Sequence, residues 1–256
     1  AVPETHQRDV HTSWWTGRVP PGCRRGAASG CPRTYQAAAK AVGNAARRGT
    51  TVINLKTTPL QSGQVFELGV VEIMFLGGWN EFPDVTGLSP AERENAISIM
   101  TRISYGGSSV LVTGDAIGRP LDGADDACDA SEAWAVQHLD PDWLSADVLI
   151  ASHHGGDNGS AECFITAVAP EHVVFSAGAQ HDHPRQSTAE RFMRLGVPAE
   201  RMLRTDRGSK SERDEWVDGL TARCGDAGGD DDIDIVFTAN ESLDIGYASA
   251  DHCRAL

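Results

Sequence analysis

Three short apolar runs constrain the fold of this chain more than any other feature of its sequence. They cover residues 108–113, 147–151 and 172–176, and they are rich in Val and Ile. Runs of this length, bounded by Gly and polar residues, are typical of buried strands. Strands that alternate with longer helical segments indicate an α/β layer, so we expect these three runs to be neighbours in one sheet.

Each run leads into residues that can bind a metal or move a proton. Asp115 follows the first run, His153 and His154 follow the second, and His181 and His183 come after the third. Catalytic groups of open α/β sheets gather at the carboxyl ends of the strands, so we expect these side chains to share one rim. A carboxylate among imidazoles suits Zn²⁺, with Mn²⁺ or Fe as alternatives. A structural role for each residue alone, as a cap or a surface histidine, stays open.

Local patterns predict the remaining elements. Alternating apolar residues predict strands at residues 51–55, 65–68, 70–76, 96–104, 201–205, 232–237 and 243–247. Helical periodicity and end signals predict helices at residues 34–48, 130–139, 160–168, 186–195 and 209–223. In the fourth of these helices we expect Phe192, Met193 and Leu195 to face the core. Ser89, Pro90 and Glu92 indicate a capping box that opens a further short helix.

Composition narrows the class of protein. The chain has 256 residues with 40% hydrophobic and 23% charged residues, which indicates a globular protein. Its net charge of −14 opposes an extended nucleic-acid-binding surface. No apolar run approaches the roughly 20 residues of a membrane span, so we expect none.

Cysteine usage favours an oxidising compartment. The six cysteines form no C-x-x-C pair, and their even number favours disulfides in a secreted or extracytoplasmic protein. We expect Cys23–Cys31 to close a short loop and Cys224–Cys253 to brace the last hairpin. Cys128–Cys163 is the pair that remains. Because pairing cannot be deduced from sequence, six free thiols in a cytoplasmic enzyme remain an alternative.

The ordered motifs resemble a known family. Thr-Gly-Asp at Asp115, His-His-Gly at His153, and Ser-Ala-Gly from Ser176 followed by His-Pro at His183 are similar to the metallo-β-lactamase superfamily. The hydrolase domain of the ComEC competence proteins is the most similar member, over roughly residues 35–206. Asn95 and Ser98 approximately match an Asn-Ser pair of that family. The resemblance implies an αββα four-layer sandwich of α/β class.

One departure from the family matters. The main metal motif of the superfamily, His-x-His-x-Asp-His, is absent from this sequence. We therefore expect that the amino-terminal portion of the domain is missing here; a site in another chain or a degenerate site are alternatives. We expect residues 1–256 to form a single such domain, with an irregular segment at 1–33 and a carboxy-terminal extension at 208–256.

The resemblance implies a metal-dependent hydrolase of phosphodiester or phosphorylated-ester bonds, acting on a small-molecule or nucleotide-like substrate. A complete site would hold two Zn²⁺ ions, with Asp115 and one of His153 and His154 as metal ligands. The other histidine would contact the substrate. His183 would stabilise the leaving group, with His181 as a weaker companion.

Two rival functions remain open. The chain could be a non-catalytic scaffold that keeps the fold and has lost the metal motif. It could also hydrolyse lactams, thioesters or sulfate esters, because a fold does not fix a substrate.

Overall fold

A computed structural model describes residues 33–55, 57–78, 88–121, 124, 126–178, 183–205, 232–238, 240 and 242–248. The chain divides into two compact units, Ala1–Pro59 and Leu60–Leu256. In the first unit, the described residues form helix α1 (Arg33–Arg47) followed by irregular chain. The strand predicted at residues 51–55 is wrong: these residues have no regular structure, and the described part of this unit offers no second strand to pair with them.

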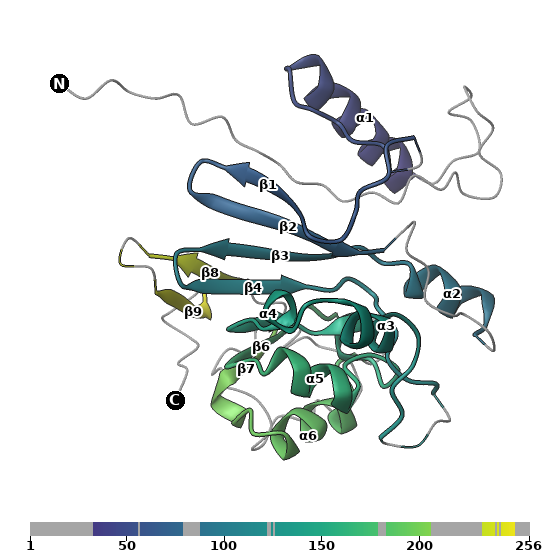
Figure 1. Cartoon of the computed structure of the whole chain (residues 1–256), viewed down its shortest axis with the longest axis vertical. Helices are drawn as coiled ribbons and strands as arrows, with labels where there is room; N and C mark the ends of the chain where they lie inside the picture. The colour runs from purple at the N-terminus through teal and green to yellow at the C-terminus, as the bar shows by residue number, and fades with distance from the viewer. Residues whose placement is uncertain are drawn as a thin grey trace. The chain divides into compact units, whose positions relative to one another are not determined.

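The second unit is built on a seven-stranded mixed sheet (Figure 1). Its strands follow chain order: β1 (Gln64–Leu68), β2 (Val71–Gly77), β3 (Met100–Tyr105), β4 (Ser108–Val112), β5 (Val148–Ile150), β6 (His172–Phe175) and β7 (Met202–Arg204). The first four strands are antiparallel, and β4 to β7 are parallel. The three apolar runs thus became adjacent parallel strands, and the α/β class is confirmed.

Helices connect the parallel strands. They are α3 (Ala130–His138) and α4 (Pro141–Leu144) before β5, α5 (Glu162–Val168) before β6, and α6 (Gln186–Arg194) before β7. Two 3₁₀ turns (Ser152–Gly155 and Ala199–Arg201) and helix α2 (Pro90–Ala96) complete this part. The capping box of α2 is confirmed, because Ser89 and Glu92 satisfy each other's backbone N–H groups.

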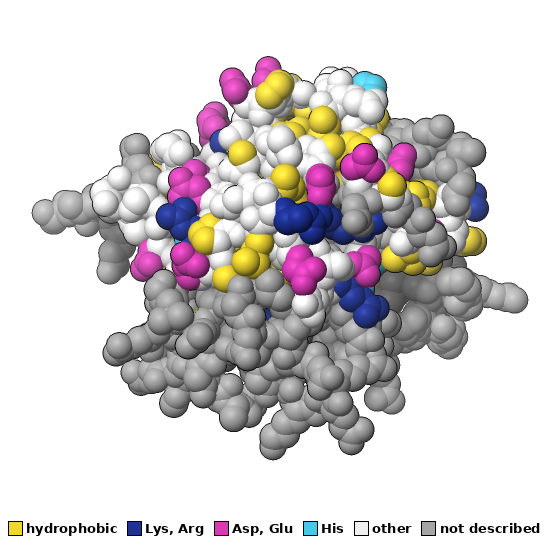
Figure 2. All heavy atoms as spheres, turned by 90° about the horizontal axis from the view of Figure 1, so that it is seen from below, with side chains coloured by type: hydrophobic (Ala, Val, Ile, Leu, Met, Phe, Trp, Pro, Cys, Tyr) yellow, Lys and Arg dark blue, Asp and Glu magenta, His cyan; other side chains and the backbone are white. Residues whose placement is uncertain are grey.

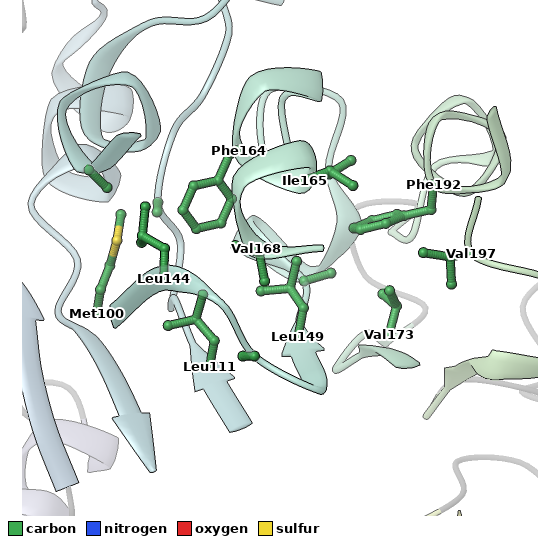
Figure 3. Packing of buried hydrophobic residues seen from close by; sticks show 14 of the residues in the cluster. Met100, Leu111, Leu144, Leu149, Phe164, Ile165, Val168, Val173, Phe192 and Val197 are labelled. Atoms are coloured by element: carbon green, nitrogen blue, oxygen red, sulfur yellow. The ribbon is translucent and has the colours of Figure 1, made fainter. Parts of the chain in front are cut away.

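The two faces of the sheet bury different residues of the same strands. Leu111, Leu149 and Val173 pair across β4, β5 and β6 and join the helices in the main core (Figure 3). Their neighbours Val110 and Val148 point to the opposite face, where they pack against the hairpin of β8 (Ile233–Phe237) and β9 (Leu243–Tyr247). This alternation follows the period of two in a pleated strand. The described residues therefore supply a helical layer, the sheet, and a hairpin on its far face.

Helix α6 corrects the sequence prediction. Phe192 is fully buried, but Met193 and Leu195 are 39% and 38% exposed, so the prediction that they face the core was wrong. Arg191 is buried instead. Its guanidinium donates to main-chain oxygens of Gly159 and Ser160 at 3.0 and 2.9 Å, which offsets the cost of burying a charge.

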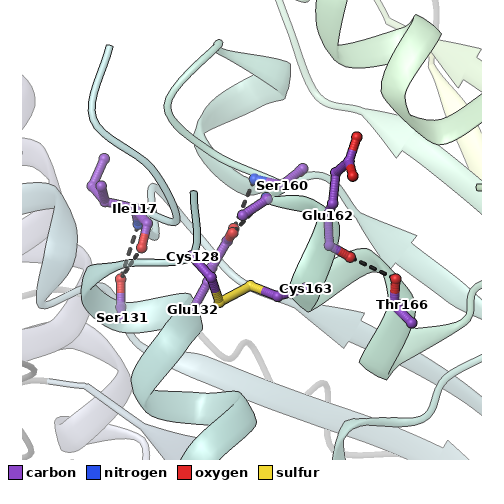
Figure 4. Close-up of a disulfide and its surroundings, with 9 residues drawn as sticks. Ile117, Cys128, Ser131, Glu132, Ser160, Glu162, Cys163 and Thr166 are labelled. Carbon is purple, nitrogen blue, oxygen red and sulfur yellow. Dashed lines mark hydrogen bonds between the residues drawn. A yellow bond between two sulfur atoms is a disulfide. The ribbon is translucent and has the colours of Figure 1, made fainter. Parts of the chain in front are cut away.

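The disulfide between Cys128 and Cys163 joins the segment before α3 to helix α5 (Figure 4). This pair is confirmed, and it fits an oxidising compartment. The predicted pairs Cys23–Cys31 and Cys224–Cys253 lie outside the described residues, as does the helix predicted at 209–223. Among the described helices, none is long and apolar enough to cross a membrane.

Basic and acidic side chains lie next to each other on the face shown in Figure 2. Arg194 of α6 pairs with Glu162 of α5 at 2.7 Å, and Arg201, directly before β7, pairs with Glu171, directly before β6, at 3.3 Å. These exposed pairs contribute little stability. They do, however, neutralise arginines that would otherwise offer charge to a polyanion.

Candidate active site

The carboxyl ends of β4 and β5 bring Asp115 close to the histidine pair. Gly114, which follows β4 after Thr113, has a positive φ of 56°, and the backbone N–H of Asp115 donates to Ser98 Oγ at 3.1 Å. The backbone N–H of His153 donates to the carbonyl of Gly114 at 2.9 Å. The two strand ends are therefore tied to each other directly, and Ser98 fixes the turn that carries Asp115.

His153 and His154 occupy an unusual backbone conformation. Their φ values are +50° and +57°, and Gly155 continues the left-handed run at +82°. Left-handed conformations of non-glycine residues cost on the order of 1 kcal/mol or more each and cluster at functional sites. Gly155 is required for a second reason, because an added Cβ would lie 2.6 Å from a ring carbon of Phe175. The surrounding structure thus holds two strained residues side by side.

The ring of His154 lies between two oxygen atoms, one from Asp115 and one from the main chain. Its Nε2 lies 3.2 Å from Asp115 Oδ1, and its Nδ1 lies 2.5 Å from the carbonyl oxygen of Ser176, directly after β6. Since a carbonyl only accepts, Nδ1 carries a proton. The Asp115 hydrogen bond raises the pKa of His154 against the opposing effect of burial, and the His154 hydrogen bond lowers the pKa of Asp115. The pair is therefore suited to a shared positive charge, either a proton or a cation.

Both ring nitrogens of His153 already have amide partners. Nδ1 lies 2.6 Å from Asn158 Oδ1, and Nε2 lies 3.2 Å from Asn95 Nδ2. His183 approaches from the segment after β6, with its ring centroid 5.2 Å from that of His153 in an edge-to-face arrangement. The structure therefore brings together Asp115, His153, His154 and His183. His181 lies outside the described residues.

Two buried side chains, Glu132 and Arg191, bind the backbone of the loop that carries Asn158. The carboxylate of Glu132, which is fully buried, accepts the backbone N–H groups of Ser160 and Ala161 at 2.8 and 2.7 Å (Figure 4). Arg191 binds carbonyls of the same stretch, at Gly159 and Ser160. The loop is thus held through its N–H groups on one side and its carbonyls on the other.

Glu132 makes stability depend on pH. Burial raises the pKa of its carboxyl from 4.5 to about 7, although bonds from Ser152 and the loop backbone and the charge of Arg191 oppose the shift. The folded state then holds this proton more tightly than the unfolded chain. Its contribution, on the order of 3 kcal/mol, is fully present below about pH 4.5 and is lost as pH rises through about 7.

Urea unfolding of the wild type and Glu132→Gln between pH 4.5 and about 8 measures this effect. The glutamine cannot titrate, so the wild type should lose stability relative to the variant as pH rises. A difference in unfolding free energy that stays constant across this range would contradict the shifted pKa.

The residues present fit part of a zinc shell. Zinc bonds of about 2.0–2.1 Å place two ligands of a tetrahedron about 3.3 Å apart, which matches the 3.2 Å between Asp115 Oδ1 and His154 Nε2. The carbonyl behind His154 is the usual outer partner of a metal-bound imidazole. Within the residues that the structure describes, no group of three or more His, Cys, Asp or Glu side chains is placed to hold one ion. Asp115 and His154 would therefore supply two ligands of a shell that needs more.

Part of this chain is similar to two known proteins. Competence protein ComA of Neisseria gonorrhoeae is 31% identical over 129 residues, which are 48% of this chain and 16% of that protein. ComE operon protein 3 of Bacillus subtilis (strain 168) is 30% identical over 119 residues, 46% of this chain and 13% of that protein. The chain is similar to competence proteins. The predicted resemblance to competence proteins is confirmed over less than half of the chain.

The matched segments cover less than a fifth of the length of these two relatives. No family model matches the chain. Membership of the wider metallo-β-lactamase superfamily therefore stays a prediction, as does the single-domain organisation of residues 1–256.

Sequence reasoning missed the two residues that support the histidines, Asn158 and Glu132. Asn158 follows His-His-Gly within Gly-Asp-Asn-Gly-Ser, a stretch typical of an ordinary turn. Glu132 lies in the first turn of α3, where an acidic residue is expected from the helix dipole alone. Neither position carries a pattern that distinguishes a buried support from a surface residue.

Proposed function

We propose that this chain is part of a metal-dependent hydrolase that cleaves phosphodiester or phosphorylated-ester bonds, with a competence-related role. The observation that carries the proposal is the contact between Asp115 and His154 at the ends of adjacent parallel strands. The relative named as a competence protein supports the biological role. The substrate class rests on that similarity and on the motifs.

The chemistry of the residues supports hydrolysis. Asp115 Oδ1 and His154 Nε2 would hold a zinc ion, which supplies a bound water acidified to a pKa of about 7. Ser176 keeps a proton of His154 on Nδ1, so that Nε2 could offer its lone pair to an ion held together with Asp115. This assignment favours His154 over His153 as the metal ligand, because both nitrogens of His153 are engaged by amides.

The remaining residues suit substrate contacts. His183 lies beside His153, on the side of the site supplied by the segment after β6. In this position a protonated His183 would donate to the oxygen that leaves phosphorus, the general-acid step of phosphodiester cleavage. His153 would accept a hydrogen bond through Nε2 when Asn95 yields to substrate.

A non-catalytic scaffold is the second candidate. It is favoured by the two-ligand shell, since the described residues provide only Asp115 and His154 at the point where an ion would lie. A binding protein of this kind would keep the fold and the strained histidine pair without turnover.

The assay compares substrates on the purified chain with added Zn²⁺ or Mn²⁺. Because the two ligands among the described residues would hold an ion only weakly, we expect slow hydrolysis of bis(p-nitrophenyl) phosphate at excess metal, which a chelator abolishes, and no hydrolysis of the lactam nitrocefin. Cleavage of nitrocefin in place of the phosphodiester would move the function to the lactam class. No turnover of either substrate, with metal bound, would favour the scaffold.

A further inference from the structure

The carbonyl group that binds His154 belongs to a peptide group whose N–H is also bound. The carbonyl oxygen of Ser176 accepts a hydrogen bond from His154 Nδ1 at 2.5 Å. The N–H of the same peptide group, which belongs to Ala177, donates to Thr205 Oγ1 at 2.9 Å. This peptide bond is trans, so its carbonyl and its N–H point in opposite directions. One planar group therefore connects the hydroxyl of Thr205 to the ring of His154.

Thr205 holds this peptide group where the sheet no longer does. The ladder between β6 and β7 ends with the pair Phe175 and Arg204, so the peptide group that follows needs other partners. Besides accepting the Ala177 N–H, the hydroxyl of Thr205 donates to the Ala177 carbonyl at 2.7 Å. The backbone N–H of Thr205 donates to the Phe175 carbonyl at 3.1 Å. Three hydrogen bonds of one residue thus fix the chain on both sides of Ser176.

The ring of His154 depends on the Ser176 carbonyl for its direction. The side chain is half exposed, and the last torsion of a histidine side chain has a broad distribution, so packing alone does not fix the ring. Asp115 at Nε2 and the Ser176 carbonyl at Nδ1 are the contacts that orient it. If the Ser176–Ala177 peptide group rotated, its carbonyl would leave Nδ1 and the ring would lose one of these two restraints.

We propose that Thr205 is a positioning residue: its hydroxyl fixes the Ser176–Ala177 peptide group, and the carbonyl of that group directs Nε2 of His154 toward Asp115. The consequence for metal binding rests on the proposed function, in which this nitrogen is a zinc ligand. The orientation of the ring itself depends on neither metal nor turnover. The alternative is that Thr205 only closes the end of the sheet, in which case its loss would lower stability without changing the site.

Three variants separate these roles. Thr205→Val removes the hydroxyl and keeps the shape of the side chain, whereas Thr205→Ser keeps the hydroxyl and removes a methyl group. Thr166→Val is the matched control. The hydroxyl of Thr166, an exposed residue of α5, donates to the Glu162 carbonyl at 2.7 Å, so this variant makes the same chemical change and loses a similar hydrogen bond within a helix.

NMR of the metal-free protein tests the positioning directly. The Cδ2–H and Cε1–H signals of His154, assigned by their loss in His154→Gln, report the surroundings of the ring, and hydrogen exchange reports the Ala177 amide. In Thr205→Val we expect the His154 signals to move and the Ala177 amide to exchange about tenfold faster, the effect of one lost hydrogen bond. Thr205→Ser and Thr166→Val should match the wild type in both measurements.

Zinc affinity, measured by competition with a chromophoric chelator, tests the consequence for the site. Thr205→Val should bind Zn²⁺ about tenfold more weakly than the wild type, the lower end of the loss typical of outer partners of a metal ligand. Thr205→Ser and Thr166→Val should keep the wild-type affinity. Urea unfolding of each variant records the change in stability separately.

His154 signals that stay in place in Thr205→Val overturn the proposal, as does an equal change in Thr205→Ser. A Thr205→Val variant that loses stability in urea but binds zinc as the wild type does also overturns it, because Thr205 would then serve the end of the sheet alone.

If the wild type binds no zinc, the proposed hydrolase fails, and the positioning role of Thr205 stands or falls on the metal-free spectra. If the wild type binds zinc and cleaves the phosphodiester while those spectra are unchanged in Thr205→Val, the hydrolase stands and the role of Thr205 does not. The two proposals therefore fail separately.

Discussion

Asp115→Asn and His154→Ala should each lower the metal-dependent hydrolysis of bis(p-nitrophenyl) phosphate more than about a hundredfold, beyond the 10- to 100-fold typical of lost outer-shell partners. The two side chains lie 3.2 Å apart, and in the proposed site each would supply a ligand that the other cannot replace. Asparagine keeps the shape of Asp115 but removes its negative charge. The fall should appear in kcat/KM measured at saturating zinc.

His138→Ala is the control for these variants. His138 is an exposed histidine of α3 whose Nδ1 contacts the carbonyl of Trp134 within its own helix. It should keep wild-type activity and wild-type metal affinity. If Asp115→Asn retained activity within a few fold of this control, the pair would not be the catalytic metal site.

Gly118→Ala should destabilise the fold by about 3 kcal/mol, the upper part of the usual range for an overpacked core. An added Cβ at Gly118 would lie 1.7 Å from Glu132 Oε2 and 2.9 Å from the Cβ of Ala161. The carboxylate would have to leave the two backbone N–H groups that it accepts, and each would remain buried. The free energy of unfolding in urea measures the loss.

Gly107→Ala makes the same chemical change where an added Cβ meets no atom within 4 Å. It should change stability by less than about 1 kcal/mol. Equal effects of the two substitutions would mean that backbone entropy, and not the collision with Glu132, sets the cost at Gly118.

The sequence predicted the part of the fold that alternation and strand ends encode. Leu111, Leu149 and Val173 face the helices, and their neighbours in sequence face the β8–β9 hairpin. This alternation of side chains between the two faces of a strand is what the sequence pattern predicted. Asp115 and His154 met because parallel strands end at the same edge of a sheet. These features depend on local periodicity and on one topological rule, and both are readable from sequence.

Other features could not be predicted because they depend on contacts distant in sequence. Residues 51–55 have strand propensity but no partner among the described residues of their unit. Arg191 displaces Met193 from the buried face of α6 because its guanidinium finds the carbonyls of a loop about 30 residues earlier in the chain. A helical pattern ranks residues by polarity and cannot anticipate such partners.

The site divides in the same way. Asp115 and the two histidines follow strands and form motifs, so the sequence predicted that they would lie close together. Its supporting residues, Asn158 and Glu132, are ordinary polar residues in a turn and a helix. Only their hydrogen bonds reveal their supporting role, because Asn158 contacts the ring of His153 and Glu132 holds the backbone of the loop after His154.

The central claim, that Asp115 and His154 form a hydrolytic metal site, is tested most directly by the rate of bis(p-nitrophenyl) phosphate hydrolysis as zinc is titrated into metal-free protein. We predict a rate that rises with zinc in the wild type, saturates, and stays at the level of free zinc in Asp115→Asn. A wild-type rate that never exceeds that of zinc alone would contradict the claim, as would an Asp115→Asn variant that follows the wild-type curve.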